Sequence, residues 1–147
     1  MTMDAARAEA WIRALAAAVA EHRQQLTDLD SAIGDGDHGS NLERGFTAVL
    51  TALDALQPDG AGAVLAKTGS TLISKVGGAS GPLYGSAFRA MGAALTGPAA
   101  DPAQLAQALA AGLAAVRKLG GAQPGDKTIV DAYAPALAAF EQAATDG

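Results

Sequence analysis

Residues 101–121 read DPAQLAQALAAGLAAVRKLGG and carry a helix start, a helix body and a helix stop in order. Asp101 is suited to cap the helix, Pro102 to occupy its first position, and Gln104 to complete a capping box. Apolar side chains then recur at helical spacing, at Leu105, Leu109, Leu113, Val116 and Leu119. Gly120-Gly121 ends the pattern. The stretch therefore predicts an amphipathic helix with one buried face.

The composition extends this helical pattern to the whole chain. Half of the 147 residues are hydrophobic but only 4% are aromatic, so the core must be built from alanine, leucine and valine. Alanine is the best helix former, and no run of β-branched residues alternates as a strand would. We expect an all-α fold, and a single domain over residues 1–147.

The charge and the missing residue types argue against several classes of protein. A net charge of −5 does not suit a nucleic-acid binder or a protein attracted to anionic membranes. The absence of cysteine excludes disulfides and thiolate metal sites. The N-terminal sequence lacks the pattern of a signal peptide, and the alanine-rich runs are too short to span a bilayer. We predict a cytoplasmic protein.

Five more helices are predicted beside the one that opens at Asp101. Their approximate ranges are 4–29, 40–56, 64–76, 82–95 and 127–143. Leu29 is placed on the buried face of the first helix, and Asp126 is the expected N-cap of the last. Pro135 is expected either to kink the last helix or to mark a later start.

The glycines concentrate in three of the connecting loops. These loops contain GDGDHG (34–39), VGGASGPLYG (76–85) and LGGAQPGDK (119–127). If six helices alternate in direction, as short connections favour, the three loops leave the bundle at the same end. We therefore expect one rim that carries the unusual chemistry.

The first of these loops lies within LDSAIGDGDHGSN, residues 29–41, and holds Asp30, Asp35 and Asp37. Three neighbouring carboxylates repel one another, and a divalent cation removes that cost. Carboxylate oxygens suit Mg²⁺, and the calcium-loop pattern does not fit. The sequence indicates a Mg²⁺ site with positions left for phosphate oxygens. A solvated acidic turn is the alternative that remains open.

Other residues on this rim are suited to an anion. His38 is a better donor to a phosphate than a ligand of Mg²⁺, and Ser40 and Asn41 open a helix whose free N–H groups favour negative charge. The segment 77–82 consists of small residues and enters the next helix, although, taken singly, a plain structural turn explains it better. The role of Lys127 is left open, between a phosphate contact and an ion pair.

Three motifs together resemble one family. LDSAIGDGDHGSN, GGASGPLYG and PGDKTIVDAYAPA, in this order and spacing, are similar to the ADP-binding subunit of phosphotransferase-system-dependent dihydroxyacetone kinase. The same domain forms part of the single-chain ATP-dependent kinases. A related domain in fatty acid kinases typically has threonine in place of His38 and a different second loop. The first family is therefore favoured.

The resemblance implies a helical barrel with nucleotide and metals at one end. Asp30, Asp35 and Asp37 would bind two Mg²⁺ ions that hold the diphosphate of ADP or ATP. Nucleotide contacts are implied for His38, Gly39, Ser40, Asn41, Gly78, Ala79, Ser80, Gly120 and Ile129. No residue of this chain is expected to act as a catalytic base, since phosphoryl transfer needs chiefly positioning and charge neutralisation.

The resemblance also implies a function that needs partners. A phosphohistidine carrier subunit would phosphorylate the bound ADP, and the resulting ATP would phosphorylate dihydroxyacetone on a second partner subunit. The alternative from another class is a nucleotide-binding regulatory or interaction module without turnover. The oligomeric state is left open, a homodimer included.

The family domain is longer than this chain by about two helices. Six helices of an eight-helix barrel would leave an open seam with exposed apolar flanks. We therefore expect the metal ligands to be present but ADP binding to be weaker than in a full-length domain.

Overall fold

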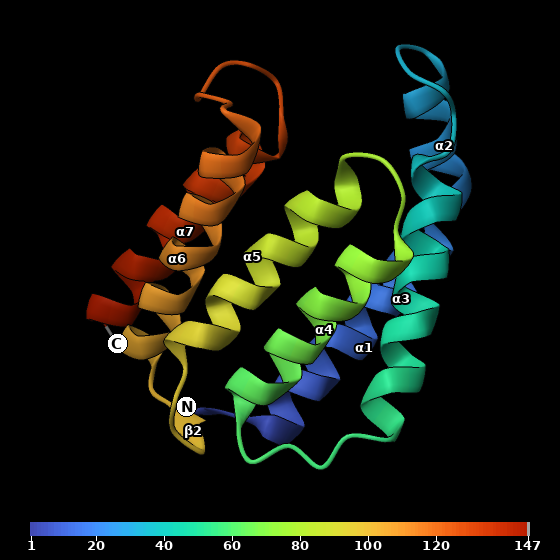
Figure 1. The fold of residues 1–147 in the computed structure, drawn as a ribbon. Helices are drawn as coiled ribbons and strands as arrows, with labels where there is room; N and C mark the ends of the chain where they lie inside the picture. Colours follow the sequence, from blue (N-terminus) through green and yellow to red (C-terminus); the bar gives the residue numbers. More distant parts are fainter. Residues whose placement is uncertain (147) are drawn as a thin grey trace.

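The structure is a computed structural model that describes residues 1–146. It is built almost entirely of helices (Figure 1). Within these residues the helices are α1 (Ala5–Glu21), α2 (Arg23–Ser31), α3 (His38–Asp54), α4 (Ala61–Lys75), α5 (Ser80–Ala94), α6 (Pro102–Gly120) and α7 (Ile129–Asp146). Two short strands, β1 (Met3–Asp4) and β2 (Ala99–Ala100), complete the elements. The all-α prediction is confirmed.

The predicted first helix is in fact two helices, so the expected count of six was wrong by one. The break falls at His22, whose backbone leaves the helical region (φ −99°, ψ 12°). A ring nitrogen of His22 lies 2.9 Å from the carbonyl oxygen of Ala18, an acceptor that the backbone N–H of His22 also uses. The chain then restarts as α2 at Arg23.

Two leucines predicted to be buried are exposed. Leu29 in α2 is 63% exposed and Leu119 in the last turn of α6 is 53% exposed. Both lie where a helix approaches the end that carries the three glycine-rich loops (Figure 1). Helical periodicity identifies a face but not how far along the helix the neighbours reach, which is why these two predictions failed.

The ends of α6 and α7 test the capping predictions. The side chain of Asp101 accepts a hydrogen bond from the backbone N–H of Gln104, and the side chain of Gln104 accepts one from the backbone N–H of Asp101. The predicted capping box is therefore confirmed. The prediction for Asp126 was wrong, because α7 begins at Ile129 and Asp126 accepts instead from the N–H of Gln123. Pro135 lies inside α7 and does not mark a later start.

A two-residue ribbon, which the sequence did not indicate, closes the opposite end. Met3 pairs with Ala100 and Asp4 with Ala99 in antiparallel register. The ribbon joins the start of α1 to the segment before α6. Asp4 also caps α1 by accepting from the N–H of Arg7, 2.9 Å away.

The helices pack mostly on their neighbours in sequence. α5 lies between α4 and α6, α3 packs on α1, α2 and α4, and α7 packs chiefly on α6. The core is built from small and medium apolar side chains, of which Ile12, Val49, Val64, Leu65 and Leu72 are fully buried. Among the described residues, none of the helices is long and apolar enough to cross a membrane.

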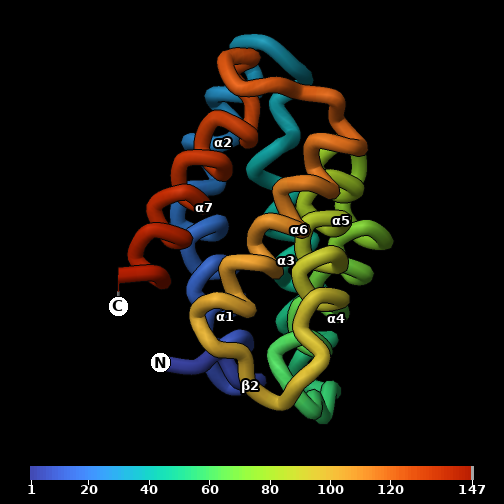
Figure 2. Tube along the Cα trace, turned by 90° about the vertical axis from the view of Figure 1, so that its left-hand side faces the viewer, coloured from blue at the N-terminus to red at the C-terminus, as the bar shows by residue number. Residues whose placement is uncertain are grey.

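This packing places the three glycine-rich loops at one end of the molecule. The α2–α3, α4–α5 and α6–α7 connections all lie at the top of Figure 1, and Figure 2 shows the first and last of them at the same end. The predicted common rim is present. The extra helix does not change the argument, because α2 follows α1 with a single residue between them.

An apolar cleft runs between α1 and α7, below this rim. Its upper part is a cavity of about 330 Å³ lined by residues from six helices, among them Trp11, Leu15, Phe46, Leu109 and Tyr133. Its lower part brings Trp11 of α1 and Phe140 of α7 to the same opening. The seam expected from the resemblance stays a prediction.

Candidate functional site

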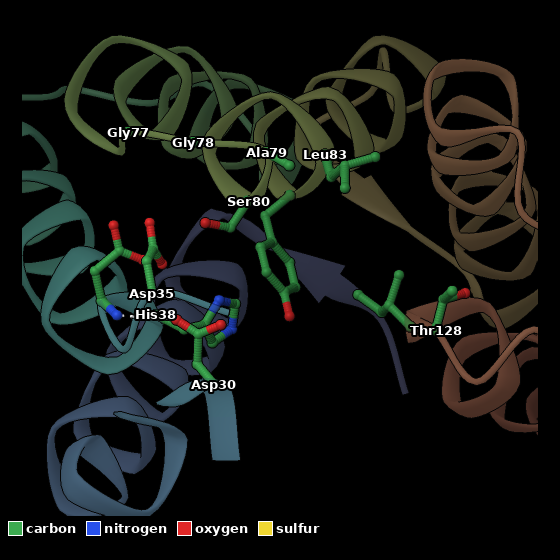
Figure 3. A pocket seen from close by; sticks show the side chains of 12 residues that line it. Asp30, Asp35, His38, Gly77, Gly78, Ala79, Ser80, Leu83 and Thr128 are labelled. Atoms are coloured by element: carbon green, nitrogen blue, oxygen red, sulfur yellow. Dashed lines mark hydrogen bonds between the residues drawn. The ribbon is translucent and has the colours of Figure 1, made fainter. Parts of the chain in front are cut away.

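A cavity of about 400 Å³ lies among the three loops at the rim (Figure 3). Its volume is in the range of small-molecule sites. The acidic loop, the start of α5 and the start of α7 each contribute, through Asp30, Asp35, Asp37, His38, Gly77, Gly78, Ala79, Ser80, Leu83, Tyr84, Thr128 and Ile129. Residues about one hundred positions apart thus meet in one pocket.

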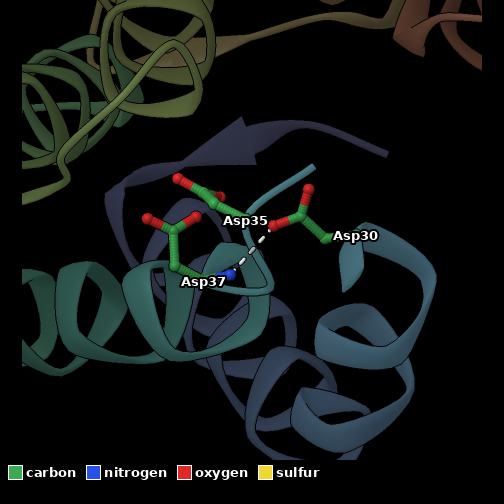
Figure 4. Close-up of side chains that lie close together, drawn as sticks. All are labelled: Asp30, Asp35 and Asp37. Carbon is green, nitrogen blue, oxygen red and sulfur yellow. Dashed lines mark hydrogen bonds between the residues drawn. The ribbon is translucent and has the colours of Figure 1, made fainter. Parts of the chain in front are cut away.

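Asp30 organises the acidic loop. Its Oδ2 accepts hydrogen bonds from the backbone N–H groups of Asp37 (2.9 Å) and His38 (3.2 Å), which closes the turn onto the end of α2 (Figure 4). These bonds, the one from Asp37 first, lower the pKa of Asp30 below its ordinary value of 3.8. Asp30 therefore stays ionised and fixes the backbone that carries the next two aspartates.

Asp35 and Asp37 complete a cluster of carboxylates. One oxygen from each of Asp30, Asp35 and Asp37 lies within 4.8 Å of the others, and Figure 4 shows the three side chains converging. The pKa of Asp35 is raised, first by a hydrogen bond shared with Asp37 and then by the negative charge of Asp37. The cluster resists holding three negative charges by itself.

The residues present fit a hard divalent cation. The cluster offers carboxylate oxygens, which are the ligands that Mg²⁺ prefers, and it faces an open cavity where further oxygens can complete the coordination. A cation would offset the mutual repulsion that raises the pKa of Asp35. The predicted metal ligands are thus brought together.

The second loop leaves space beside α5. No atom of the described residues lies within 4 Å of a Cβ added at Gly77 or Gly78, and Gly78 has the left-handed φ of +67° that glycine tolerates. Within residues 1–146, no side chain caps the start of α5. The first N–H groups of this helix therefore remain available to an anion, as free helix N-termini do.

The third loop supplies the far wall of the cavity. Thr128 and Ile129 line it at the start of α7, and Figure 3 shows Thr128 across the cavity from Asp30 and Asp35. The Oγ1 of Thr128 accepts from the N–H of Val130 at 3.2 Å. The hydroxyl proton of Thr128 is then free to donate to a ligand.

His38 and Tyr84 separate the polar cavity from the apolar cleft. Their ring centroids are 6.3 Å apart, and both residues, with Ile129, line the two spaces. Burial raises the pKa of Tyr84. The rings of His38 and Tyr84 thus form the boundary between the polar cavity and the apolar side chains of the cleft.

The structure brings some predicted nucleotide contacts to the cavity and not others. His38, Gly78, Ala79, Ser80 and Ile129 line it. Four do not, namely Gly39, Ser40, Asn41 and Gly120.

Gly39 and Asn41 have packing roles. A Cβ added at Gly39 would overlap the carbonyl oxygen of Arg23, so glycine lets α3 approach α2 closely. Asn41 is buried and accepts a hydrogen bond from Arg44 at 2.8 Å. The hydroxyl of Ser40 donates to the carbonyl oxygen of Asp37. Their predicted contacts with a nucleotide stay predictions.

Leu83, Tyr84 and Thr128 line the cavity but were not among the predicted site residues. Tyr84 stands four positions after Ser80 in α5, so the two share a helix face. That spacing is a signal that could have identified Tyr84. Leu83 had no such signal, because an apolar residue at this position reads as core.

Comparison with known proteins agrees with this geometry. Residues 32–147 match the model of the DAK2 domain. The chain is 41% identical to the ADP-binding subunit of PEP-dependent dihydroxyacetone kinase 1 of Listeria innocua, over 97% of this chain and 72% of that protein. It is 42% identical to the corresponding Escherichia coli subunit, over 81% of this chain and 57% of that protein.

A solved structure matches at the level of the fold. The crystal structure of the dihydroxyacetone kinase of C. freundii in complex with AMP-PNP and Mg²⁺ superimposes with a TM-score of 0.78 at 28% identity. The match covers 96% of this chain but only 27% of that one.

Proposed function

Because the chain belongs to the DAK2 domain family, we propose that it is the nucleotide-holding subunit of a cytoplasmic dihydroxyacetone kinase. In this role it keeps Mg²⁺-ADP bound while a phosphoryl group passes from a phosphohistidine carrier subunit to dihydroxyacetone on a second partner subunit. The observation that carries the proposal is the acidic cluster lying across one cavity from an uncapped helix start.

The acidic loop would hold the cations. Asp30, Asp35 and Asp37 would bind Mg²⁺, two ions in our proposal, which supply the positive charge that phosphoryl transfer requires. Asp30 has a second task in the same loop, because its Oδ2 is used by two backbone N–H groups. Its Oδ1 is then the oxygen left to face a cation.

The other two loops would hold the nucleotide. The N–H groups at the start of α5 and the hydroxyl of Ser80 are suited to phosphate oxygens, and Gly77 and Gly78 leave room for them. His38 would donate to a phosphate from the opposite wall. Ile129 offers an apolar surface to the base or sugar.

The chain contributes no general base in this account. Phosphoryl transfer depends on in-line positioning and on neutralising the charge that develops on the transferred group. A cavity walled by carboxylates and backbone N–H groups supplies both when cations are held. The open cavity also leaves a path along which partner subunits reach the phosphates.

Reconstitution tests the proposal. The chain is mixed with Mg²⁺-ADP, a dihydroxyacetone-binding subunit and a phosphorylated carrier subunit of the relatives' kinases, and dihydroxyacetone phosphate is measured. We expect product only when all components are present. Nucleotide binding without product would favour the regulatory module instead.

A further inference from the structure

The loop between α6 and α7 is tied to a single side chain, that of Asp131. Its Oδ1 accepts from the backbone N–H of Gly125 at 2.7 Å, and its Oδ2 accepts from the N–H of Lys127 at 2.8 Å. Both donors lie outside α7, although Asp131 is in the first turn of that helix. The carboxylate therefore fixes the loop at two points, and it also interacts with the backbone N–H of Thr128 at the start of its own helix.

The backbone at both points has an unusual conformation. Gly125 has φ +97° and Lys127 has φ +60°, in the left-handed region. Lys127 is the only residue other than glycine with a positive φ among the described residues. Such a conformation persists in a residue with a Cβ only where its surroundings fix it. The hydrogen bond from the N–H of Lys127 to the carboxylate of Asp131 holds the backbone of Lys127 in this conformation.

The pocket-lining residues follow immediately. Thr128 and Ile129 come next in the chain and line the cavity. The N–H of Asp131 donates to the carbonyl oxygen of Thr128 at 3.0 Å, so Asp131 also holds Thr128 through its own backbone. α7 packs chiefly on α6, and this loop is the link between the two.

We infer that Asp131 is a positioning residue of the nucleotide pocket. It holds residues 125–128 in the one backbone shape that directs Thr128 and Ile129 into the cavity, without touching the nucleotide itself. This role rests on the proposed function and adds to it the residue that sets the far wall. Because the same backbone bonds lower the pKa of Asp131, its carboxylate is ionised at neutral pH.

The test compares Asp131→Asn with Glu141→Gln. Both variants remove one negative charge from an exposed site on α7, but Glu141 lies far from the loop. Three quantities are measured on the full chain: amide hydrogen exchange at Gly125 and Lys127 without ligand, affinity for Mg²⁺-ADP, and affinity for Mn²⁺ alone. The melting temperature is recorded for each variant.

We expect Asp131→Asn to speed exchange at Gly125 and Lys127 and to weaken Mg²⁺-ADP binding roughly tenfold, the loss expected when charge-assisted bonds that order a site are removed. Mn²⁺ binding should not change, because the acidic cluster is in another loop. Glu141→Gln should match the unsubstituted chain in every measurement. A role in general stability would instead lower Mn²⁺ affinity together with nucleotide affinity.

Unchanged amide exchange in Asp131→Asn would overturn the inference, because the loop would then not depend on the carboxylate. Faster exchange with unchanged Mg²⁺-ADP affinity would overturn the positioning role. If the unsubstituted chain does not bind Mg²⁺-ADP at all, the proposed function fails and the positioning role fails with it, and the exchange rates still report whether Asp131 orders the loop.

Discussion

The α2–α3 loop and the α6–α7 loop are ordered by the same arrangement of hydrogen bonds but have different surroundings. In each, one aspartate accepts two backbone N–H groups of the loop, from Asp37 and His38 at Asp30 and from Gly125 and Lys127 at Asp131. Asp30 precedes its loop and Asp131 follows its loop. In both cases the backbone bonds lower the pKa of the aspartate.

The two loops differ in the side chains that they add to the cavity. The first loop adds Asp35 and Asp37, so that the carboxylates form a cluster. The second adds Thr128 and Ile129, a hydroxyl and an apolar surface. The same arrangement of hydrogen bonds thus orders a carboxylate cluster at one wall of the cavity and a hydroxyl and an apolar side chain at the other. We expect substitutions in the two loops to separate metal binding from nucleotide binding.

The largest expected effect is that of Asp30→Asn. This change removes a proposed cation ligand and weakens the bonds that order the acidic loop, so we expect Mg²⁺-ADP affinity to fall by about 100-fold or more. Titration calorimetry measures the loss. Asp59→Asn, an exposed aspartate in the α3–α4 turn, is the matched control and should bind as the unsubstituted chain does. Equal Mg²⁺-ADP affinities of Asp30→Asn and Asp59→Asn would contradict the assignment of cation binding to the acidic loop.

Gly39→Ala should lower stability more than nucleotide affinity. The added Cβ would overlap the carbonyl oxygen of Arg23 and crowd the hydroxyl of Thr27, so α2 and α3 must move apart. We expect the melting temperature to fall by several degrees, roughly the effect of 1–2 kcal/mol of overpacking in a domain of this size. Gly77→Ala, which adds its Cβ to open space among the described residues, is the control. An unchanged melting temperature in Gly39→Ala would leave nucleotide contact as the better explanation of this glycine.

Asp35→Asn should stabilise the metal-free chain. The pKa of Asp35 is raised, so the ionised side chain opposes folding at neutral pH, and this cost disappears below its unfolded value of about 3.8. In chelator at pH 7, we expect the melting temperature to rise by about 1–2 °C, with no gain at pH 3. Saturating Mg²⁺ should reverse the order of the two proteins. A destabilised variant in chelator would show that Asp35 does not repel its neighbours.

The smallest expected effect is on the acid side of the stability profile. The pKa of Asp131 is lowered, so its stabilising contribution is present above the ordinary value of 3.8 and is lost as the pH falls through the folded value. Asp131→Asn should therefore melt about 1 °C lower than the unsubstituted chain at pH 7 and at the same temperature in strong acid. Thermal melts from pH 7 to pH 2 measure this. A difference in melting temperature between the two proteins that grows as the pH falls would contradict a lowered pKa of Asp131.

The sequence was sufficient for the helical class and for the rim, for identifiable reasons. Helical spacing and the capping box at Asp101 depend on residues a few positions apart, and alternation of helix direction then places the glycine-rich loops together. The cluster of carboxylates could also be predicted, because Asp35 and Asp37 lie within one loop and Asp30 is only five positions before Asp35.

Other features depend on contacts that spacing does not encode. The exposure of Leu29 is set by how far the neighbouring helices reach, and no spacing in the sequence marks the break at His22. Asp126 was a reasonable cap by sequence, but Asp131 bonds the loop and α7 starts three residues later than Asp126. Long-range packing and competing local hydrogen bonds account for these failures.

The central claim is that the three loops form a metal-dependent site for a nucleoside diphosphate. Calorimetric titration of ADP into this chain, in excess Mg²⁺ and then in excess chelator, tests it most directly, with adenosine as the ligand that lacks phosphates. We predict that ADP binds in Mg²⁺, that chelation weakens binding by about 100-fold, and that adenosine binds poorly in both conditions. Absence of ADP binding in Mg²⁺, or equal affinity with and without the metal, would contradict the account.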